Sequence, residues 1–246
     1  MILALVLSAA AAPRADAVTY TYGGTTLSGY VVYDDATTTK RPGLVMVPNW
    51  MGINDTAIAK AKMIAGTRYV LLLADMYGKD VRPKTQDEAQ KAATAVYGDR
   101  AMMRGRANAA LDALKATKAP VDTTKLGAIG FCFGGSSVLE LARSGTALDG
   151  VVSFHGGLST ESPGTKFNTP LLVINGGADG YVSAADIAAF QTEVATAGAD
   201  WQFVQMGGAV HCFTETEANS PGCLYDAKVA TRAYALMSDF FDEVLK

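Results

Sequence analysis

The sequence Gly130-Phe131-Cys132-Phe133-Gly134-Gly135 follows directly after the apolar run at residues 126–129. This order predicts a strand, a sharp turn and the start of a helix, with the thiol of Cys132 at the apex. The spacing is typical of a nucleophile elbow, in which strained backbone holds a reactive side chain above a sheet. The glycines let strand and helix approach without a clash of Cβ atoms. The free N–H groups and dipole of a helix N-terminus also favour the thiolate.

A buried structural cysteine is the alternative interpretation of this segment. Glycine makes up 25 of the 246 residues, so the glycines beside Cys132 could also occur by chance. The elbow hypothesis therefore depends on whether an acid and a base follow in a suitable order.

Such an acid and base do follow, in the order nucleophile, acid and then His that accompanies this elbow. An apolar strand predicted at 171–174 leads into a loop that contains Asp179. A second strand at 201–206 leads through two glycines to His211. The chain has only two His, and His155 precedes the loop acid. The order favours His211 as the general base and leaves His155 as a packed or supporting side chain.

Short motifs are spread over most of the chain. They are Ala74-Asp75-Met76-Tyr77-Gly78, Gly-Phe-Cys-Phe-Gly-Gly at 130–135, Gly-Ala-Asp at 177–179, Ala-Val-His-Cys-Phe-Thr at 209–214 and Tyr225-Asp226-Ala227-Lys228. The set resembles the dienelactone hydrolase family, the cysteine hydrolases of the α/β-hydrolase superfamily. The similarity runs from about Val18 to the C-terminus and is far more specific than the elbow alone.

The resemblance implies an α/β-hydrolase fold and a triad of Cys132, His211 and Asp179 that hydrolyses small esters or lactones. It also implies an oxyanion hole formed by the backbone N–H groups of Trp50 and Phe133. Physical reasoning agrees, because one donor follows the nucleophile and the other lies in the loop after an early strand. Such chemistry requires no metal ion and no organic cofactor.

Position 49 departs from the family pattern. Family members usually carry Glu after the strand predicted at 43–48, where it can pair with the resting thiol, but this chain has Asn49. An amide can hydrogen-bond the sulfur but cannot exchange a proton with it at ordinary pH. We therefore expect His211 and the helix N-terminus to govern the resting state of Cys132. Alternatively, Asn49 is only a turn residue.

The residues after His211 bear on the substrate. Family members that act on dienelactone hold its carboxylate with basic residues. This chain continues with Cys212-Phe213-Thr214-Glu215, without a nearby Arg. We therefore expect a less acidic ester or lactone.

Apolar strands and helices alternate from Pro42 onward, which predicts βαβ units and a mainly parallel sheet with helices on both faces. An antiparallel hairpin at 18–22 and 26–33 precedes them at the sheet edge. The predicted strands are 43–48, 69–74, 125–130, 149–154, 170–175 and 201–206, and the predicted helices are 55–65, 86–97, 99–117, 135–144, 183–197 and 226–245.

Polar and reactive side chains follow the ends of these strands, where ligands bind in open α/β sheets. They are Asn49, Asp75, Cys132, His155, Asp179 and His211. We expect Asp75 to orient a loop and Tyr77 to form a pocket wall.

Length and composition predict one ordered domain, residues 18–246. Hydrophobic residues make up 49% of the chain and charged residues 18%, which excludes a disordered protein. A net charge of −3 gives no basic footprint for nucleic acid. The oligomeric state is not readable from the sequence.

Residues 1–17 are expected to form a secretion signal. The apolar stretch at 2–12 is too short to span a bilayer, and it leads to the small-residue cleavage pattern Ala15-Asp16-Ala17. We therefore expect a periplasmic or secreted protein without stable membrane insertion. No basic residue precedes the apolar stretch, so a cytoplasmic location is the alternative.

Cys212 and Cys223 bracket a short polar loop directly after His211. In an oxidising compartment they could form a disulfide that stiffens this loop, and otherwise both remain reduced. Three scattered Cys and two His lack the spacing of a zinc site.

Two functions from other classes remain as alternatives. The scaffold could bind a ligand without catalysis if the altered Asn49 loop leaves the thiol unproductive. Cys132 could also be a redox-responsive thiol, because exposed thiolates oxidise readily.

Overall fold

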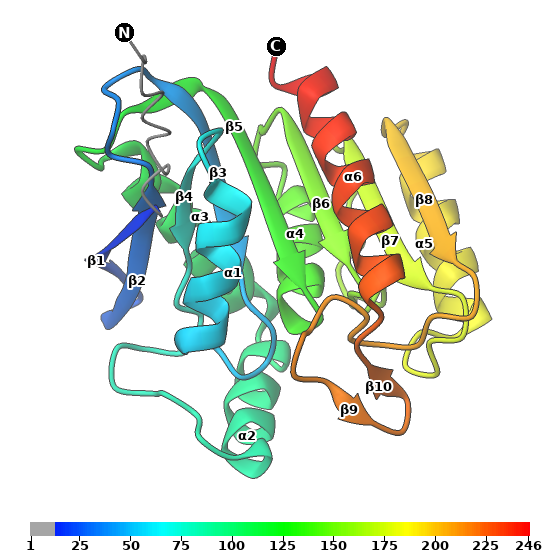
Figure 1. The fold of residues 1–246 in the computed structure, drawn as a ribbon. Helices are drawn as coiled ribbons and strands as arrows, with labels where there is room; N and C mark the ends of the chain where they lie inside the picture. The colour runs from blue at the N-terminus through cyan, green and yellow to red at the C-terminus, as the bar shows by residue number, and fades with distance from the viewer. Residues whose placement is uncertain (1–12) are drawn as a thin grey trace, which may run out of the picture.

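The computed structural model of the protein describes residues 13–246 and contains an eight-stranded sheet of order β1-β2-β4-β3-β5-β6-β7-β8 (Figure 1). The strands are β1 (Arg14–Tyr22), β2 (Thr25–Tyr33), β3 (Arg41–Val47), β4 (Val70–Leu73), β5 (Val121–Phe131), β6 (Gly150–Phe154), β7 (Leu171–Gly176) and β8 (Trp201–Met206). Neighbouring strands from β4 to β8 are parallel, whereas β1 pairs with β2 and β2 with β4 in antiparallel fashion. The predicted mainly parallel sheet with an antiparallel hairpin at its edge is confirmed.

Helices cover both faces of this sheet, as predicted (Figure 1). They are α1 (Asp55–Ala65), α2 (Gln86–Tyr97), α3 (Arg100–Lys115), α4 (Phe133–Arg143), α5 (Ala184–Thr196) and α6 (Ala227–Val244). Side chains of α1 and α6 pack in one hydrophobic core, and side chains of α2 to α5 pack in a second core on the opposite face.

Continuous apolar runs explain why the central strands lie between two helical layers. Every residue of β6 and β7 is buried. Short Val, Leu and Ile runs of this kind are typical of parallel strands that are covered on both faces. Burial of each large apolar side chain contributes roughly 1.5–3 kcal/mol, so the sheet is a rigid support for the loops at its carboxyl ends.

The N-terminal edge strand is longer than expected. β1 begins at Arg14 instead of residue 18, and residues 14–17 pair with residues 30–33 of β2. Most of the expected secretion signal lies outside the described residues. Secretion therefore stays a prediction, which sequencing of the mature N-terminus would test. Among the described residues, no helix is long and apolar enough to cross a membrane.

A second, two-stranded sheet was not anticipated from the sequence. It consists of β9 (Asn219–Ser220) and β10 (Cys223–Leu224), which pair antiparallel beyond the carboxyl ends of the main sheet (Figure 1). Strands of two residues carry no periodicity that a sequence pattern could reveal.

The elbow after β5 is built on two very close backbone approaches. A Cβ atom on Gly130 would lie 2.0 Å from the carbonyl oxygen of Gly134. A Cβ atom on Gly134 would lie 2.1 Å from the carbonyl oxygen of Val47, at the end of β3. The start of α4 therefore packs directly against the backbone of β5 and β3, and only glycine fits at both positions.

Replacing Gly134 with Ala should destabilise the fold by roughly 1–3 kcal/mol or more, because the new methyl group meets rigid backbone. Gly207→Ala is the matched control, since a Cβ atom there meets nothing within 4 Å. Urea unfolding should show a large loss for Gly134→Ala and a change within about 0.5 kcal/mol for the control. Equal stabilities would contradict the close packing.

Candidate active site

Cys132 lies at the apex of the elbow, between the last residue of β5 and the first residue of α4. Its backbone has φ 54° and ψ −116°, which is a strained conformation for a residue with a side chain. The Cys132 N–H group donates hydrogen bonds to the carbonyl oxygen of Phe154 at 3.0 Å and to Nδ1 of His155 at 3.1 Å. These bonds hold the turn so that a half-buried thiol stands at the carboxyl edge of the sheet.

Two other predicted site residues, Asp179 and His211, meet at the same edge of the sheet. Nδ1 of His211 lies 2.8 Å from Oδ2 of Asp179, and both side chains are buried. The other carboxylate oxygen of Asp179 accepts a hydrogen bond from the Tyr181 N–H group at 2.9 Å. The carboxylate is thus fixed by its own loop, and it orients the imidazole of His211.

The surroundings of His211 favour its charged form. Burial lowers the pKa of His211, but the hydrogen bond with Asp179 and the neighbouring Cys132 outweigh burial and raise the pKa to about 10. The ring of Tyr181, an exposed residue, lies 5.0 Å from the imidazole, centroid to centroid. His211 is therefore an imidazolium at neutral pH, and it lies between a carboxylate and a thiol.

His155 has a different environment from His211. It is fully buried, and burial lowers its pKa well below the usual value, with the charges of His211 and Lys60 adding to the effect. Because Nδ1 accepts the Cys132 N–H group, the proton lies on Nε2, which donates to Oγ1 of Thr214 at 2.8 Å. His155 is thus a neutral support for the elbow backbone.

Two backbone N–H groups are available near the thiol. Phe133 is the first residue of α4, so its N–H group has no partner within the helix. The Trp50 N–H group donates no hydrogen bond to the part of the chain described here, while the Trp50 carbonyl accepts one from the Tyr77 hydroxyl at 2.8 Å. The start of α4, which carries Phe133, packs against the backbone at the end of β3, directly before the loop that carries Trp50.

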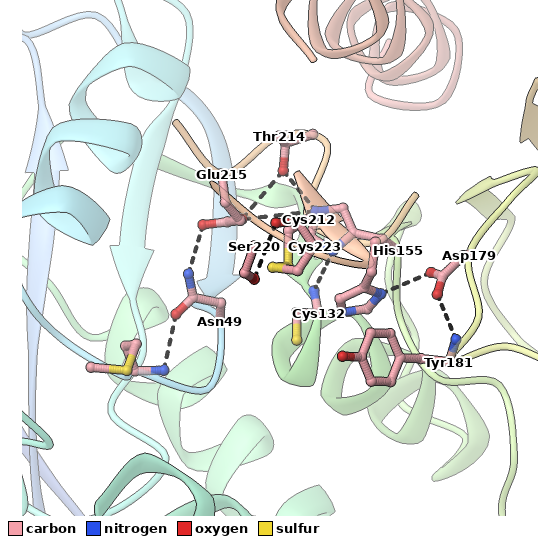
Figure 2. The surroundings of a disulfide bond; sticks show 12 residues. Asn49, Cys132, His155, Asp179, Tyr181, Cys212, Thr214, Glu215, Ser220 and Cys223 are labelled. Carbon is pink, nitrogen blue, oxygen red and sulfur yellow. Dashed lines mark hydrogen bonds and ion pairs between the residues drawn. A yellow bond between two sulfur atoms is a disulfide. The ribbon is translucent and has the colours of Figure 1, made fainter. Parts of the chain in front are cut away.

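Asn49 does not bond the thiol, although the sequence allowed this. Its Nδ2 donates to Oε2 of Glu215 at 2.6 Å, and its Oδ1 accepts from the Met51 N–H group at 2.9 Å (Figure 2). Glu215 is buried and also pairs with Lys60 of α1. Sequence reasoning missed Lys60 and the role of Glu215. The sequence did contain one signal, because Glu215 is a charged residue only four positions after the candidate base His211.

Cys212 and Cys223 form a disulfide that spans the loop after His211 (Figure 2). His211 forms a bridge with Cys223, and its carbonyl oxygen accepts the Leu224 N–H group at 3.1 Å. This attaches the imidazole-bearing segment to β10 on one side, while Asp179 holds the ring on the other.

A cavity of about 590 Å³ lies between the loop at 77–83 and helices α2 and α3, and Cys132, Asp179 and His211 do not line it. Tyr77 forms part of its wall, and Arg106 lines it from α3. Nη1 of Arg106 donates hydrogen bonds to the carbonyl oxygens of Met76 and Tyr77. Asp75 accepts hydrogen bonds from the N–H groups of Tyr77 and Gly78 and thereby orients this loop.

Within residues 13–246, no group of three or more His, Cys, Asp or Glu could hold a metal ion.

Most of the chain matches the model of one known protein family. A family model described as "Dienelactone hydrolase family" matches residues 27–245. The chain belongs to the dienelactone hydrolase family. The recognition made from the motifs, and the α/β-hydrolase fold that it implied, are thereby confirmed.

Solved structures of dienelactone hydrolase-like proteins agree with this assignment. A dienelactone hydrolase-like promiscuous phosphotriesterase, P91, from metagenomic libraries is 37% identical, with a TM-score of 0.90 over 96% of this chain and 100% of that chain. The dienelactone hydrolase of Anabaena variabilis is 21% identical, with a TM-score of 0.68 over 96% and 100% of the two chains, and it supports the fold alone.

A curated relative from Bradyrhizobium is named a probable 2-oxo-3-(5-oxofuran-2-ylidene)propanoate lactonase. It is 26% identical over 190 residues, which cover 72% of this chain and 75% of the relative. The family match shows that the chain is a member of a hydrolase family.

Asp179→Asn should lower the pKa of His211 from about 10 toward its ordinary value near 6.5, because the imidazolium loses its anionic partner. NMR titration of the imidazole would show deprotonation at lower pH. The same raised pKa stabilises the fold fully below about pH 6.5, and this contribution is lost as the pH rises through about 10. Tyr181→Phe keeps the backbone donor and the ring, so it serves as the control. An unchanged midpoint in Asp179→Asn would contradict the pairing.

Proposed function

We propose that this protein hydrolyses carboxylic esters or lactones through a covalent thioester on Cys132. The observation that carries the proposal is the 2.8 Å hydrogen bond between His211 and Asp179, at the sheet edge where the elbow presents a half-buried thiol. Such an acid, base and nucleophile arrangement activates a side chain for attack on a carbonyl carbon. Membership of a hydrolase family supports the same reaction class.

The first half of the reaction forms the acyl-enzyme. The Cys132 thiolate attacks the carbonyl carbon, a C–S bond forms, and the carbonyl electron pair moves onto oxygen. The N–H groups of Trp50 and Phe133 stabilise this oxyanion, and one such donor typically contributes roughly 2.7–4 kcal/mol. When the intermediate collapses, the ester C–O bond breaks, and the His211 imidazolium gives its Nε2 proton to the leaving alkoxide.

The second half releases the acid. His211, now neutral, takes a proton from water, whose oxygen attacks the thioester carbonyl. The C–S bond then breaks, which returns the thiolate of Cys132 beside the imidazolium and leaves a carboxylic acid as the product. Asp179 holds the His211 tautomer and stabilises the imidazolium in both halves.

The substrate class follows from the charges around His211. No Arg or Lys follows His211 closely in the sequence, and the cation of Lys60 is already paired with Glu215. Neutral esters and lactones therefore suit the site better than strongly acidic ones. Phosphotriesters form a second candidate class, because a relative with 37% identity is described as a promiscuous phosphotriesterase.

Cys132→Ala should reduce hydrolysis of aryl esters and lactones by roughly 10³-fold or more, because the nucleophile is lost. Steady-state assays should include neutral esters, lactones and a phosphotriester, with Ser137→Ala as the control for a hydroxyl inside α4. Full activity in Cys132→Ala would exclude the thioester route. Ligand binding without turnover would instead support a binding protein, and function that follows sulfenic acid formation at Cys132 would support a redox-responsive thiol.

A further inference from the structure

A buried ion pair lies next to the proposed oxyanion hole, outside the triad. Nζ of Lys60 is 2.5 Å from Oε1 of Glu215, and the side chains are 8% and 10% exposed. Burial lowers the pKa of Lys60, whereas the Glu215 carboxylate opposes that change. Charges buried to this degree are costly unless each remaining lone pair and proton finds a partner. The partners of Glu215 show what this pair holds in place.

One oxygen of Glu215 controls the loop that carries Trp50. Oε2 accepts Nδ2 of Asn49 at 2.6 Å, so the amide is turned with its Oδ1 toward the Met51 N–H group at 2.9 Å. The carbonyl oxygen of Asn49 also accepts the Gly52 N–H group at 2.9 Å. The Trp50 peptide lies between these two bonded positions. Its N–H group is thus aimed by an Asn side chain that the carboxylate orients.

The other oxygen of Glu215 leads to the elbow. Oε1 accepts the Thr214 hydroxyl at 3.3 Å, and Oγ1 of Thr214 accepts Nε2–H of His155 at 2.8 Å. Nδ1 of His155 in turn accepts the Cys132 N–H group. The next N–H group along the chain belongs to Phe133, which is the second proposed oxyanion donor. A single carboxylate is therefore linked by hydrogen bonds to both loops that form the oxyanion hole.

Lys60 adds a contact on the same side of the elbow. Its Nζ lies 4.2 Å from the centroid of the Phe131 ring, and Phe131 directly precedes Cys132. A cation over an aromatic face is attractive, and more so when both are removed from water. Lys60 therefore neutralises Glu215 and packs against the strand end that leads into the turn.

We propose that Glu215, paired with Lys60, is a positioning residue that sets the geometry of the oxyanion hole through Asn49 and through Thr214 and His155. This inference rests on the proposed hydrolase function. Glu215 does not touch the substrate in this scheme. It aligns two backbone donors, and alignment matters because an error of about 1 Å in such a site can cost 10²-fold in rate.

The test uses Asn49→Ala, which cuts the link to the Trp50 loop and leaves the Lys60–Glu215 pair intact. We expect kcat for a neutral aryl ester to fall roughly 10- to 100-fold with little change in KM, because an oxyanion donor acts mainly in the transition state. Alkylation of Cys132 by iodoacetamide passes through no oxyanion, so its rate should stay at the wild-type value. Glu217→Gln, on the exposed part of the same loop, should leave both rates unchanged.

A double-mutant cycle completes the test. Glu215→Gln should also lower kcat, and combining it with Asn49→Ala should cost less than the product of the two separate losses, because both act through one chain of hydrogen bonds. Wild-type kcat in Asn49→Ala, or fully multiplicative losses in the double variant, would overturn the inference. A parallel fall in alkylation and kcat would do the same, since it would indicate a general disturbance of the thiol.

If Glu215→Gln does not fold, Asn49→Ala alone still decides between these outcomes. Failure of the proposed function has a different signature, because Cys132→Ala would then retain hydrolysis. In that case the effect of Asn49→Ala on kcat would not concern an oxyanion at Cys132.

Discussion

The close backbone packing at the elbow is the constraint on which the site depends. Gly130 and Gly134 let β5, α4 and the end of β3 approach to distances that no Cβ atom would allow. This packing forces Cys132 into a positive φ and places its thiol at the sheet edge. It also brings the first N–H group of α4 next to the loop after β3. The candidate nucleophile and two candidate oxyanion donors are therefore consequences of one packing arrangement.

The charged side chains of the candidate site form two regions, one on each side of the elbow. Next to the thiol, Asp179 and Cys132 favour the imidazolium of His211 and raise its pKa to about 10. On the other side of the elbow, the charge of Glu215 is compensated by Lys60. His155 lies between the two regions and remains neutral because it is fully buried. The two histidines at this edge of the sheet therefore differ in protonation state, His211 being charged and His155 neutral.

The sequence predicted most of the fold, because the signals that define it are local. Apolar strand runs, alternation with helices and the glycines of the elbow gave the parallel sheet, the hairpin and the helices. It also indicated that Cys132, Asp179 and His211 follow strand ends, and ends of parallel strands share an edge. The extension of β1 to Arg14 was missed because residues 14–17 combine charged and small side chains with no strand pattern.

The hydrogen-bond network behind the proposed oxyanion hole could not be predicted from such local signals. Lys60 and Glu215 are 155 positions apart, and a Lys in an amphipathic helix ordinarily faces water. Only the tertiary structure shows that both are buried and that Asn49 turns toward Glu215 and not toward the thiol. The departure at position 49 was visible in the sequence, but its partner was not, since hydrogen bonds between distant loops leave no periodic signal.

Acylation of Cys132 during turnover is the step on which the proposed hydrolysis depends. The most direct measurement is rapid acid quenching of the wild-type protein with an aryl ester, followed by mass spectrometry of its peptides. We expect an early burst of phenolate and an equal amount of acyl group on the peptide that contains Cys132. An acyl group on any other side chain, or the same adduct in Cys132→Ala, would contradict it.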